Sequence, residues 1–237
     1  MKKEHLSKEI KAILFDLDGT LINVDLKRFV PEYLKLLAST VSHLVRQNKF
    51  ISKLLIASEA VNNNDGTQTN EEVFEKTFFP LIGYTREEIN PYFDKFYEED
   101  FSKLRQYTQK KPAARRVMEY VFKKGYIVVI ATTPLLPETA MRQRLQWAGV
   151  GDFSYHLITN IENSYSNKPN LSYYQSILEY IDVPAEKCLM VGDEAKDMVA
   201  ANLGIKTYLV KSDNTDLTPD IPEPNYRGTL ADLEHLL

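Results

Sequence analysis

The sequence predicts an α/β protein in which a doubly wound parallel sheet carries an inserted all-helical domain. The run Ala12–Phe15 contains no polar residue, which is typical of a strand covered on both faces of a parallel sheet. From Pro112 onward, helical and strand patterns alternate as in βαβ units. Between these regions the pattern is helical almost throughout. We therefore expect a core built from residues 1–24 and 108–237, interrupted by a helical insert over residues 25–107.

The insert carries start and stop signals for its helices. Strand-like character stops after Leu21, and apolar residues then recur at spacings of three and four. Thr69 or Asn70 is expected to cap a helix that ends near Gly83. Thr85 is followed three residues later by a glutamate, which fits the capping box of the next helix.

The core continues as a regular alternation of helices and strands. A glycine stops several of the helices, and β-branched residues mark the strands. The expected helices cover 113–124, 139–147, 171–181, 198–203 and the end of the chain near 230–237; the expected strands cover 126–132, 156–159, 187–191 and 206–210, with a surface loop over 212–224.

The composition is that of an ordinary globular protein. Of the 237 residues, 43% are hydrophobic and 26% are charged, which argues against long disordered segments. The net charge of −4 predicts no general attraction to nucleic acid or to a membrane surface. Residues 1–11 lack the apolar core of a secretory signal, and no stretch approaches the ~20 apolar residues of a membrane span. We expect a cytoplasmic protein.

Cysteine and histidine chemistry is not indicated. The single cysteine, Cys188, excludes an internal disulfide framework, and its apolar neighbours predict buried packing rather than a nucleophile. The histidines form no pair at metal-ligand spacing.

Polar residues follow the first strand abruptly. Asp16 and Asp18 are two positions apart, so in an extended chain their side chains point to the same side. Gly19 gives the backbone freedom to turn sharply. The carboxyl end of a strand is where open α/β sheets bind ligands, and two facing acids repel unless a cation lies between them. Taken alone, the same residues have a simpler explanation, which is a polar turn after a strand with no catalytic role.

Further polar groups stand where a parallel sheet would bring them together. Thr132 and Asp193 each follow a predicted strand, Asp197 comes four residues after Asp193, and Lys168 lies in a loop before a helix. Each has a plain structural explanation on its own, such as a turn, an exposed loop lysine or acids in a first helical turn. Their coincidence in order, type and strand-end position favours a site.

The motifs resemble a known family. D-L-D-G-T at 16–20, A-T-T at 131–133, N-K-P around Lys168 and G-D-x-x-x-D at 192–197 resemble the four signature motifs of the haloacid dehalogenase-like hydrolase superfamily. The helical insert is similar to the C1 type of cap in relatives of phosphoglycolate phosphatase and β-phosphoglucomutase. The resemblance implies a Rossmann-like core and an enzyme that hydrolyses phosphoric monoesters.

The resemblance also implies a magnesium-dependent reaction through an aspartyl-phosphate. A phosphate dianion repels an approaching carboxylate, so a divalent cation must neutralise part of the charge. Asp16, the main-chain carbonyl of Asp18 and Asp193 would supply oxygen ligands to Mg²⁺. Asp16 would attack phosphorus, and Asp18 would protonate the departing alkoxide and later deprotonate the attacking water.

The remaining motif residues would hold the phosphate. Thr132 and Lys168 would bind its oxygens, and main-chain N–H groups near Leu17 and Thr133 would donate further hydrogen bonds. Asp197 would tether either Lys168 or a metal-bound water.

Other functions remain open at this point. The family's true dehalogenases have no aspartate at the position of Asp18, because a halide leaves without a proton. A phosphomutase would use the same aspartyl-phosphate and differ in how the cap excludes water. A phosphonatase would need a marked cap lysine, and neither Lys53 nor Lys76 stands out. A non-enzymatic receiver-like signalling module would be shorter, without a cap or a second acid, and a silent binding protein would not need every motif residue.

The substrate is not defined by the sequence beyond a small phosphorylated metabolite. Asn23, Arg28 and Arg86 are candidates to contact it, although a solvated surface position is the favoured explanation for each of them. We expect no nucleic acid or membrane partner, and either a monomer or a homodimer.

Overall fold

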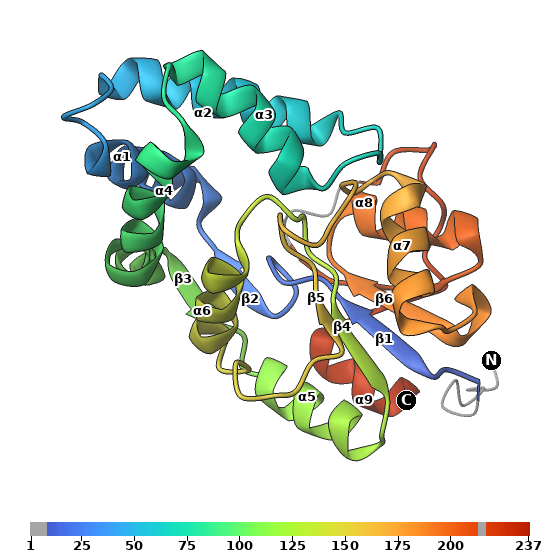
Figure 1. The fold of residues 1–237 in the computed structure, drawn as a ribbon. Coiled ribbons are helices and arrows are strands. Elements are labelled where there is room, and N and C mark those ends of the chain that lie inside the picture. The colour runs from blue at the N-terminus through green and yellow to red at the C-terminus, as the bar shows by residue number, and fades with distance from the viewer. Residues whose placement is uncertain (1–8, 213–216) are drawn as a thin grey trace.

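The computed structural model describes residues 9–212 and 217–237. A six-stranded sheet forms the core, helices cover both of its faces, and the helical insert lies to one side (Figure 1). Residues 1–8 of the charged N-terminal segment and residues 213–216 of the expected surface loop lie outside the described residues. Within the described ranges, no helix combines the length and the apolar character that crossing a membrane requires.

The core sheet is parallel throughout. Its strands are β1 (Ala12–Phe15), β4 (Ile127–Ile130), β5 (Leu157–Ile158), β6 (Cys188–Gly192), β7 (Lys206–Val210) and β8 (Tyr226–Gly228). Their order is β5-β4-β1-β6-β7-β8, and β1 places Phe15 beside Ile130 and Val191. The chain winds outward from β1 on one side and from β6 on the other. The carboxyl ends of these central strands therefore lie at a topological switch point, where open α/β sheets bind ligands.

Alternate residues of each strand face opposite layers of the core. Ile13 and Phe15 belong to the apolar cluster that includes residues of α5, α6 and the C-terminal helix, whereas Ala12 and Leu14 belong to the cluster under α7. This period of two is what a strand buried on both sides requires. The core helices are α5 (Ala114–Lys123), α6 (Glu138–Ala148), α7 (Leu171–Ile181), α8 (Ala195–Met198) and α9 (Leu233–Leu236), with short helical turns η4 (Ala185–Lys187), η5 (Val199–Leu203) and η6 (Leu230–Asp232).

The insert is built from helices alone, and the expected capping signals are present. Its helices are α1 (Leu26–Thr40), α2 (Gln47–Asn62), α3 (Asn70–Ile82) and α4 (Arg86–Lys95), followed by a π-helical turn η2 (Phe96–Asp100) and a 3₁₀ segment η3 (Phe101–Tyr107). Thr69 caps α3 and forms a capping box with Glu72, and Gly83 ends that helix in the left-handed conformation. Thr85 and Glu88 form the same box at α4. These predictions are confirmed.

Aromatic residues join the insert to the core. Phe96 and Phe101 are fully buried. Phe101 stacks on Trp147 of α6, with ring centroids 5.2 Å apart. The insert thus packs directly on the helix that follows β4.

The expectation that strand structure stops after Leu21 is wrong. Residues Ile22–Val24 form β2, which pairs antiparallel with β3 (Thr108–Lys110). Each strand has three residues, too few for an alternating pattern to be visible in the sequence. The chain enters the insert through β2 and returns to the core through β3, so the paired strands form one two-stranded connection between the two parts. The strand β8 was also not predicted, and β4 and β5 are shorter than expected.

The fold class predicted from the sequence is confirmed. The structure has the parallel sheet wound outward from β1 on one side and from β6 on the other, and it has the all-helical insert between β2 and β3 (Figure 1).

Candidate active site

Three of the predicted site residues follow the neighbouring strands β1, β4 and β6 at the same edge of the sheet. Asp16 follows β1 directly, is 4% exposed, and donates its backbone N–H to the carbonyl of Val191 in β6. Thr132 follows β4 and Asp193 follows β6, and both side chains are buried. The register of the sheet therefore brings these three sequence-predicted residues to one edge.

Lys168 reaches the same place from the loop before α7. Its ammonium group donates to Asp16 Oδ1 at 2.8 Å and to Asp197 Oδ1 at 2.5 Å, and all three side chains are buried. The second carboxylate oxygen of Asp197 accepts the backbone N–H of Glu194 at 3.2 Å. Both carboxylate oxygens of Asp197 thus accept a hydrogen bond. The contact with Lys168 is one of the two roles that the sequence analysis considered for Asp197.

A tight turn packs against Asp193. Gly19 has φ +76°, and a Cβ atom placed there would lie 2.1 Å from a carboxylate oxygen of Asp193. Thr20 donates its hydroxyl to the other oxygen of Asp193 at 3.2 Å. Lys111, which follows β3, donates from its ammonium group to the carbonyl of Gly19. Only glycine fits at position 19, for both conformational and steric reasons.

Burial and charge shift the pKa values of these groups. Burial raises the pKa of Asp16 to about 8, although the Lys168 ammonium opposes that rise. Burial also raises the pKa of Asp193. Burial lowers the pKa of Lys168, but Asp16 and Asp197 outweigh it and leave that pKa well above its ordinary range. The cluster therefore holds more carboxylates than the buried ammonium can neutralise.

This excess of carboxylate oxygens fits a hard divalent cation. Oxygen atoms of Asp16, Asp193 and Asp197 lie within 4.8 Å of one another. Oxygen-only donors suit Mg²⁺, and a bound cation would offset the unfavourable burial of these acids. Since Asp197 already serves Lys168 and Glu194, Asp16 and Asp193 are the side chains in this cluster best suited to coordinate such an ion.

Backbone donors surround the same edge. Within the described residues, the backbone N–H groups of Leu17 and Thr133 have no hydrogen-bond acceptor. Thr132 is held in place through its backbone: its N–H donates to the Thr159 hydroxyl at 3.1 Å, and its carbonyl accepts the Tyr173 hydroxyl at 2.8 Å. These free N–H groups and the Thr132 side chain form a lining suited to an anion.

Sequence reasoning missed Arg144, which forms an ion pair with Asp18. Arg144 lies on α6 and is 5% exposed. A signal was available, because it lies on the face of this helix where Ala140, Met141 and Ala148 are buried. A charged residue at a core position of an amphipathic helix needs a partner, and that partner is here.

Sequence reasoning also missed a buried asparagine cluster between insert and core, formed by Asn64, Asn70 and Asn167. The Asn70 amide donates to Asn167 Oδ1 at 2.9 Å and accepts from the Asn64 amide at 2.8 Å. Asn70 is fully buried. Its backbone N–H makes a further hydrogen bond to the core, to the Ser164 carbonyl at 2.7 Å. Asn167 directly precedes Lys168, so the end of α2 and the first residue of α3 contact the loop that carries the site lysine. Single asparagines in loops or at a helix start give no sequence signal for such contacts.

The three candidate substrate-selecting residues are exposed or engaged elsewhere. Asn23 lies exposed in β2. Arg28 has a side chain 75% exposed and pairs with Asp25 at 3.6 Å. Arg86 pairs with Glu71 and Glu75 on α3. None of these described contacts reaches Asp16 or Lys168.

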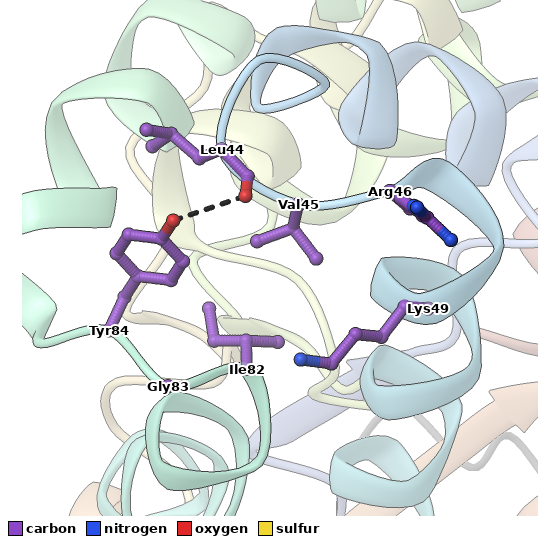
Figure 2. Close-up of a pocket in the computed structure, with 7 residues that line it drawn as sticks. All are labelled: Leu44, Val45, Arg46, Lys49, Ile82, Gly83 and Tyr84. Carbon is purple, nitrogen blue, oxygen red and sulfur yellow. Dashed lines mark hydrogen bonds between the residues drawn. The ribbon is translucent and has the colours of Figure 1, made fainter.

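A hollow on the insert contains none of the site residues. It has a volume of about 530 Å³ and lies where the turn after α1 meets the ends of α2 and α3 (Figure 2). The Tyr84 hydroxyl donates to the Leu44 carbonyl at 3.1 Å beside it. Its lining residues are Leu44, Val45, Arg46, Lys49, Ile82, Gly83 and Tyr84. The chemistry indicated by the buried acids therefore lies elsewhere, at the strand ends.

The motif residues gathered at the sheet edge agree with a comparison of the whole chain against protein families. The model of haloacid dehalogenase-like hydrolases matches residues 10–204. The chain belongs to this family. The resemblance that its motifs indicated is confirmed, and so is the expectation that it is a hydrolytic enzyme.

Relatives and solved structures of this family cover nearly the same length. The chain is 26% identical to pyrophosphatase PpaX of Bacillus mycoides over 203 residues, which cover 85% of this chain and 84% of that protein. The PpaX of Bacillus cereus strain G9842 is 28% identical over 205 residues, which cover 85% and 83%.

Two solved structures share the fold of this haloacid dehalogenase-like hydrolase. One is a HAD phosphatase from Thermococcus onnurineus, with a TM-score of 0.60, 18% identity and coverage of 96% and 97% of the two chains. The other is the L-2-haloacid dehalogenase of Xanthobacter autotrophicus with chloropropionic acid covalently bound, with a TM-score of 0.56, 15% identity and coverage of 96% and 98%. Phosphatases and dehalogenases thus share this architecture, so the choice between them depends on individual residues of the site.

Proposed function

We propose that this protein is a Mg²⁺-dependent phosphatase that hydrolyses a small phosphorylated metabolite through an aspartyl-phosphate on Asp16. One observation carries the proposal. Lys168 bonds Asp16 and Asp197 at the carboxyl edge of the sheet, with Asp193 adjacent, and every member is buried. A buried, oriented carboxylate with an excess of acid around it is suited to attack phosphorus beside a divalent cation.

Asp16, the main-chain carbonyl of Asp18 and Asp193 would hold the Mg²⁺ ion. When bound, the ion supplies positive charge that offsets the repulsion between the phosphate and the carboxylate of Asp16. The buried acids and their raised pKa values support this assignment.

The other residues of the site bind and orient the phosphate. Lys168 fixes the position of Asp16 and contributes positive charge for the phosphate oxygens, while Asp197 fixes the lysine. Thr132 and the N–H groups of Leu17 and Thr133, which have no acceptor in the described part of the chain, donate to the same oxygens. Attack of the Asp16 carboxylate then forms the new phosphorus–oxygen bond as the bond to the leaving group breaks.

Asp18 serves as the proton carrier. It gives a proton to the leaving oxygen and later accepts one from the water that hydrolyses the aspartyl-phosphate. A halide would leave without that proton, so the aspartate at position 18 favours a phosphate ester or anhydride over a haloacid. The names of the PpaX relatives make inorganic pyrophosphate a substrate to test, alongside phosphate esters of small metabolites.

We further propose that residues 25–107 act as a cap over a core of residues 1–24 and 108–237. The paired strands β2 and β3 join the two parts beside Asp18. A cap attached there can exclude bulk water from Asp16 during the reaction.

Hydrolysis of p-nitrophenyl phosphate tests the proposal. The purified protein should release phosphate with Mg²⁺ and not with excess EDTA, and Asp16→Asn should reduce the rate to background. Asp18→Asn should retain substrate binding and lower kcat. Asp152→Asn is the matched control, because this exposed aspartate pairs with Arg115 and with no other residue that the structure describes. Wild-type rates in Asp16→Asn would exclude Asp16 as the nucleophile.

A further inference from the structure

Arg144 is a buried cation at the boundary between the core and the insert. Its helix, α6, packs beneath the insert, and its guanidinium carbon lies 5.6 Å from the ring centroid of Phe29 in α1. On its other side it pairs with Asp18 through one terminal nitrogen. The guanidinium therefore lies between the proposed proton carrier and the proposed cap.

The hydrogen bonding of this arginine is incomplete. Its Nε atom is buried and has no hydrogen-bond partner among the described residues, although the side chain is only 6% exposed. A buried donor without an acceptor costs about 1–3 kcal/mol, and more on a charged group. A purely structural arginine in this position would be expected to use that donor.

The geometry of a guanidinium indicates what would complete the site. Its N–H groups form a planar fork that matches the two oxygens of a carboxylate or phosphate group. Phe29 offers an apolar ring and no acceptor to this fork. An anionic group of a bound molecule is the kind of acceptor that Nε lacks among the described residues.

We propose that Arg144 binds a second anionic group, carried by the leaving group of the substrate. This inference rests on the proposed phosphatase function and narrows its substrate class. Asp18, in that mechanism, protonates the leaving oxygen, so a residue that contacts Asp18 lies on the leaving-group side of phosphorus. The substrate class is a phosphoanhydride such as pyrophosphate, or a phosphate ester of a small acid.

Steady-state kinetics with paired substrates tests the inference. Inorganic pyrophosphate and phosphoglycolate carry an anion on the leaving group, and p-nitrophenyl phosphate does not. Wild-type protein should have a higher kcat/KM for at least one of the first two. Arg144→Gln should raise KM for that substrate roughly 10- to 100-fold, as expected for loss of a charge-assisted hydrogen bond. Its KM for p-nitrophenyl phosphate should change less than about threefold.

Matched variants separate binding from folding. Arg142→Gln removes an exposed arginine of the same helix, whose one partner among the described residues is Glu138, and should leave the kinetics of both kinds of substrate unchanged. Arg144→Lys keeps the charge and should recover part of the lost affinity; it also replaces Arg144→Gln if that variant fails to fold. Calorimetric titration with methylenediphosphonate and phenylphosphonate, in excess Mg²⁺, measures binding without turnover. Only the diphosphonate should lose affinity in the Arg144 variants.

Three results would overturn the inference. The first is an equal loss of kcat/KM in Arg144→Gln for both kinds of substrate, which would mean that Arg144 acts only through Asp18 or through folding. The second is unchanged kinetics and binding in both Arg144 variants. The third is a wild-type preference for p-nitrophenyl phosphate over both anionic substrates. Each differs from failure of the proposed function, in which wild-type protein would hydrolyse no phosphate compound with Mg²⁺.

Discussion

Replacing Asn70 with alanine should weaken both the stability of the protein and its proposed activity. The Asn70 amide bridges the insert and the core, because it accepts from Asn64 at 2.8 Å and donates to Asn167 Oδ1 at 2.9 Å. Asn167 in turn donates to the Val61 carbonyl at 3.1 Å. Truncation removes the only described donor to Asn167 Oδ1 and leaves that oxygen buried.

The size of the effect follows from these contacts. Each lost hydrogen bond contributes about 1 kcal/mol net, and an unsatisfied buried acceptor costs about 1–3 kcal/mol. We expect a loss of roughly 2–4 kcal/mol in the free energy of unfolding, which for a chain of this size lowers the melting temperature by roughly 5–15 °C. Because Asn167 adjoins Lys168, we also expect kcat to fall for the folded protein.

Thermal unfolding followed by circular dichroism, with phosphatase assays well below the transition, measures both effects. Asn63→Ala is the matched control, since the side chain of this exposed neighbour bonds Glu59 and no other described residue, and it should change stability by less than about 0.5 kcal/mol. If Asn70→Ala and Asn63→Ala had the same melting temperature, the buried hydrogen bonds of Asn70 would contribute nothing to the stability of the protein. A lower melting temperature with unchanged kcat would refute the link to Lys168.

Three further changes should affect the site directly. Asp197→Asn should lower kcat roughly 10- to 100-fold, because it weakens the tether of Lys168. Gly19→Ala should abolish activity, since its Cβ would lie 2.1 Å from Asp193 and the left-handed backbone costs a further ~1–2 kcal/mol. Mg²⁺ at about 100 times its Kd should stabilise the fold by about 2.7 kcal/mol. Its affinity should rise with pH and level off above about 8, because below its raised pKa the metal-free Asp16 must lose a proton to bind.

These outcomes are measured by steady-state kinetics for the two variants and by thermal shift against Mg²⁺ at several pH values. Gly66→Ala is the control for Gly19→Ala, because it shares a positive φ but its Cβ would meet no atom closer than 3.8 Å. It should cost stability without loss of kcat. Wild-type kcat in Asp197→Asn, full activity in Gly19→Ala, or Mg²⁺ affinity that is constant between pH 5 and 8 would each contradict the corresponding reasoning.

Much of the fold could be predicted because its signals are local. The capping boxes at Thr69 and Thr85 and the left-handed Gly83 act within one helical turn, so the sequence shows them directly. The unbroken apolar run of β1 reports its burial on both faces. The site motifs could be placed together because parallel strands end at one edge of a sheet.

The remaining features depend on contacts between distant segments. The strands β2 and β3 exist because residues 22–24 and 108–110 meet at the crossing between core and insert, and neither has a strand pattern of its own. Asn70 and Asn167 lie 97 positions apart, at the start of α3 and in the loop before α7, and their contact forms only when the insert docks on the core. Arg144 was detectable only as a charge on an apolar helix face, and its partner Asp18 is 126 positions away.

Direct trapping of phosphorylated Asp16 tests the central claim. The protein would be mixed with substrate and Mg²⁺, quenched in acid during turnover, reduced with borohydride and digested with trypsin, which releases residues 12–27 as one peptide. Reduction of an aspartyl-phosphate converts that aspartate to homoserine, and fragment masses locate it. We predict homoserine at position 16 in wild-type protein and none in Asp16→Asn. Modification at another residue, or turnover in Asp16→Asn at the wild-type rate, would contradict the account.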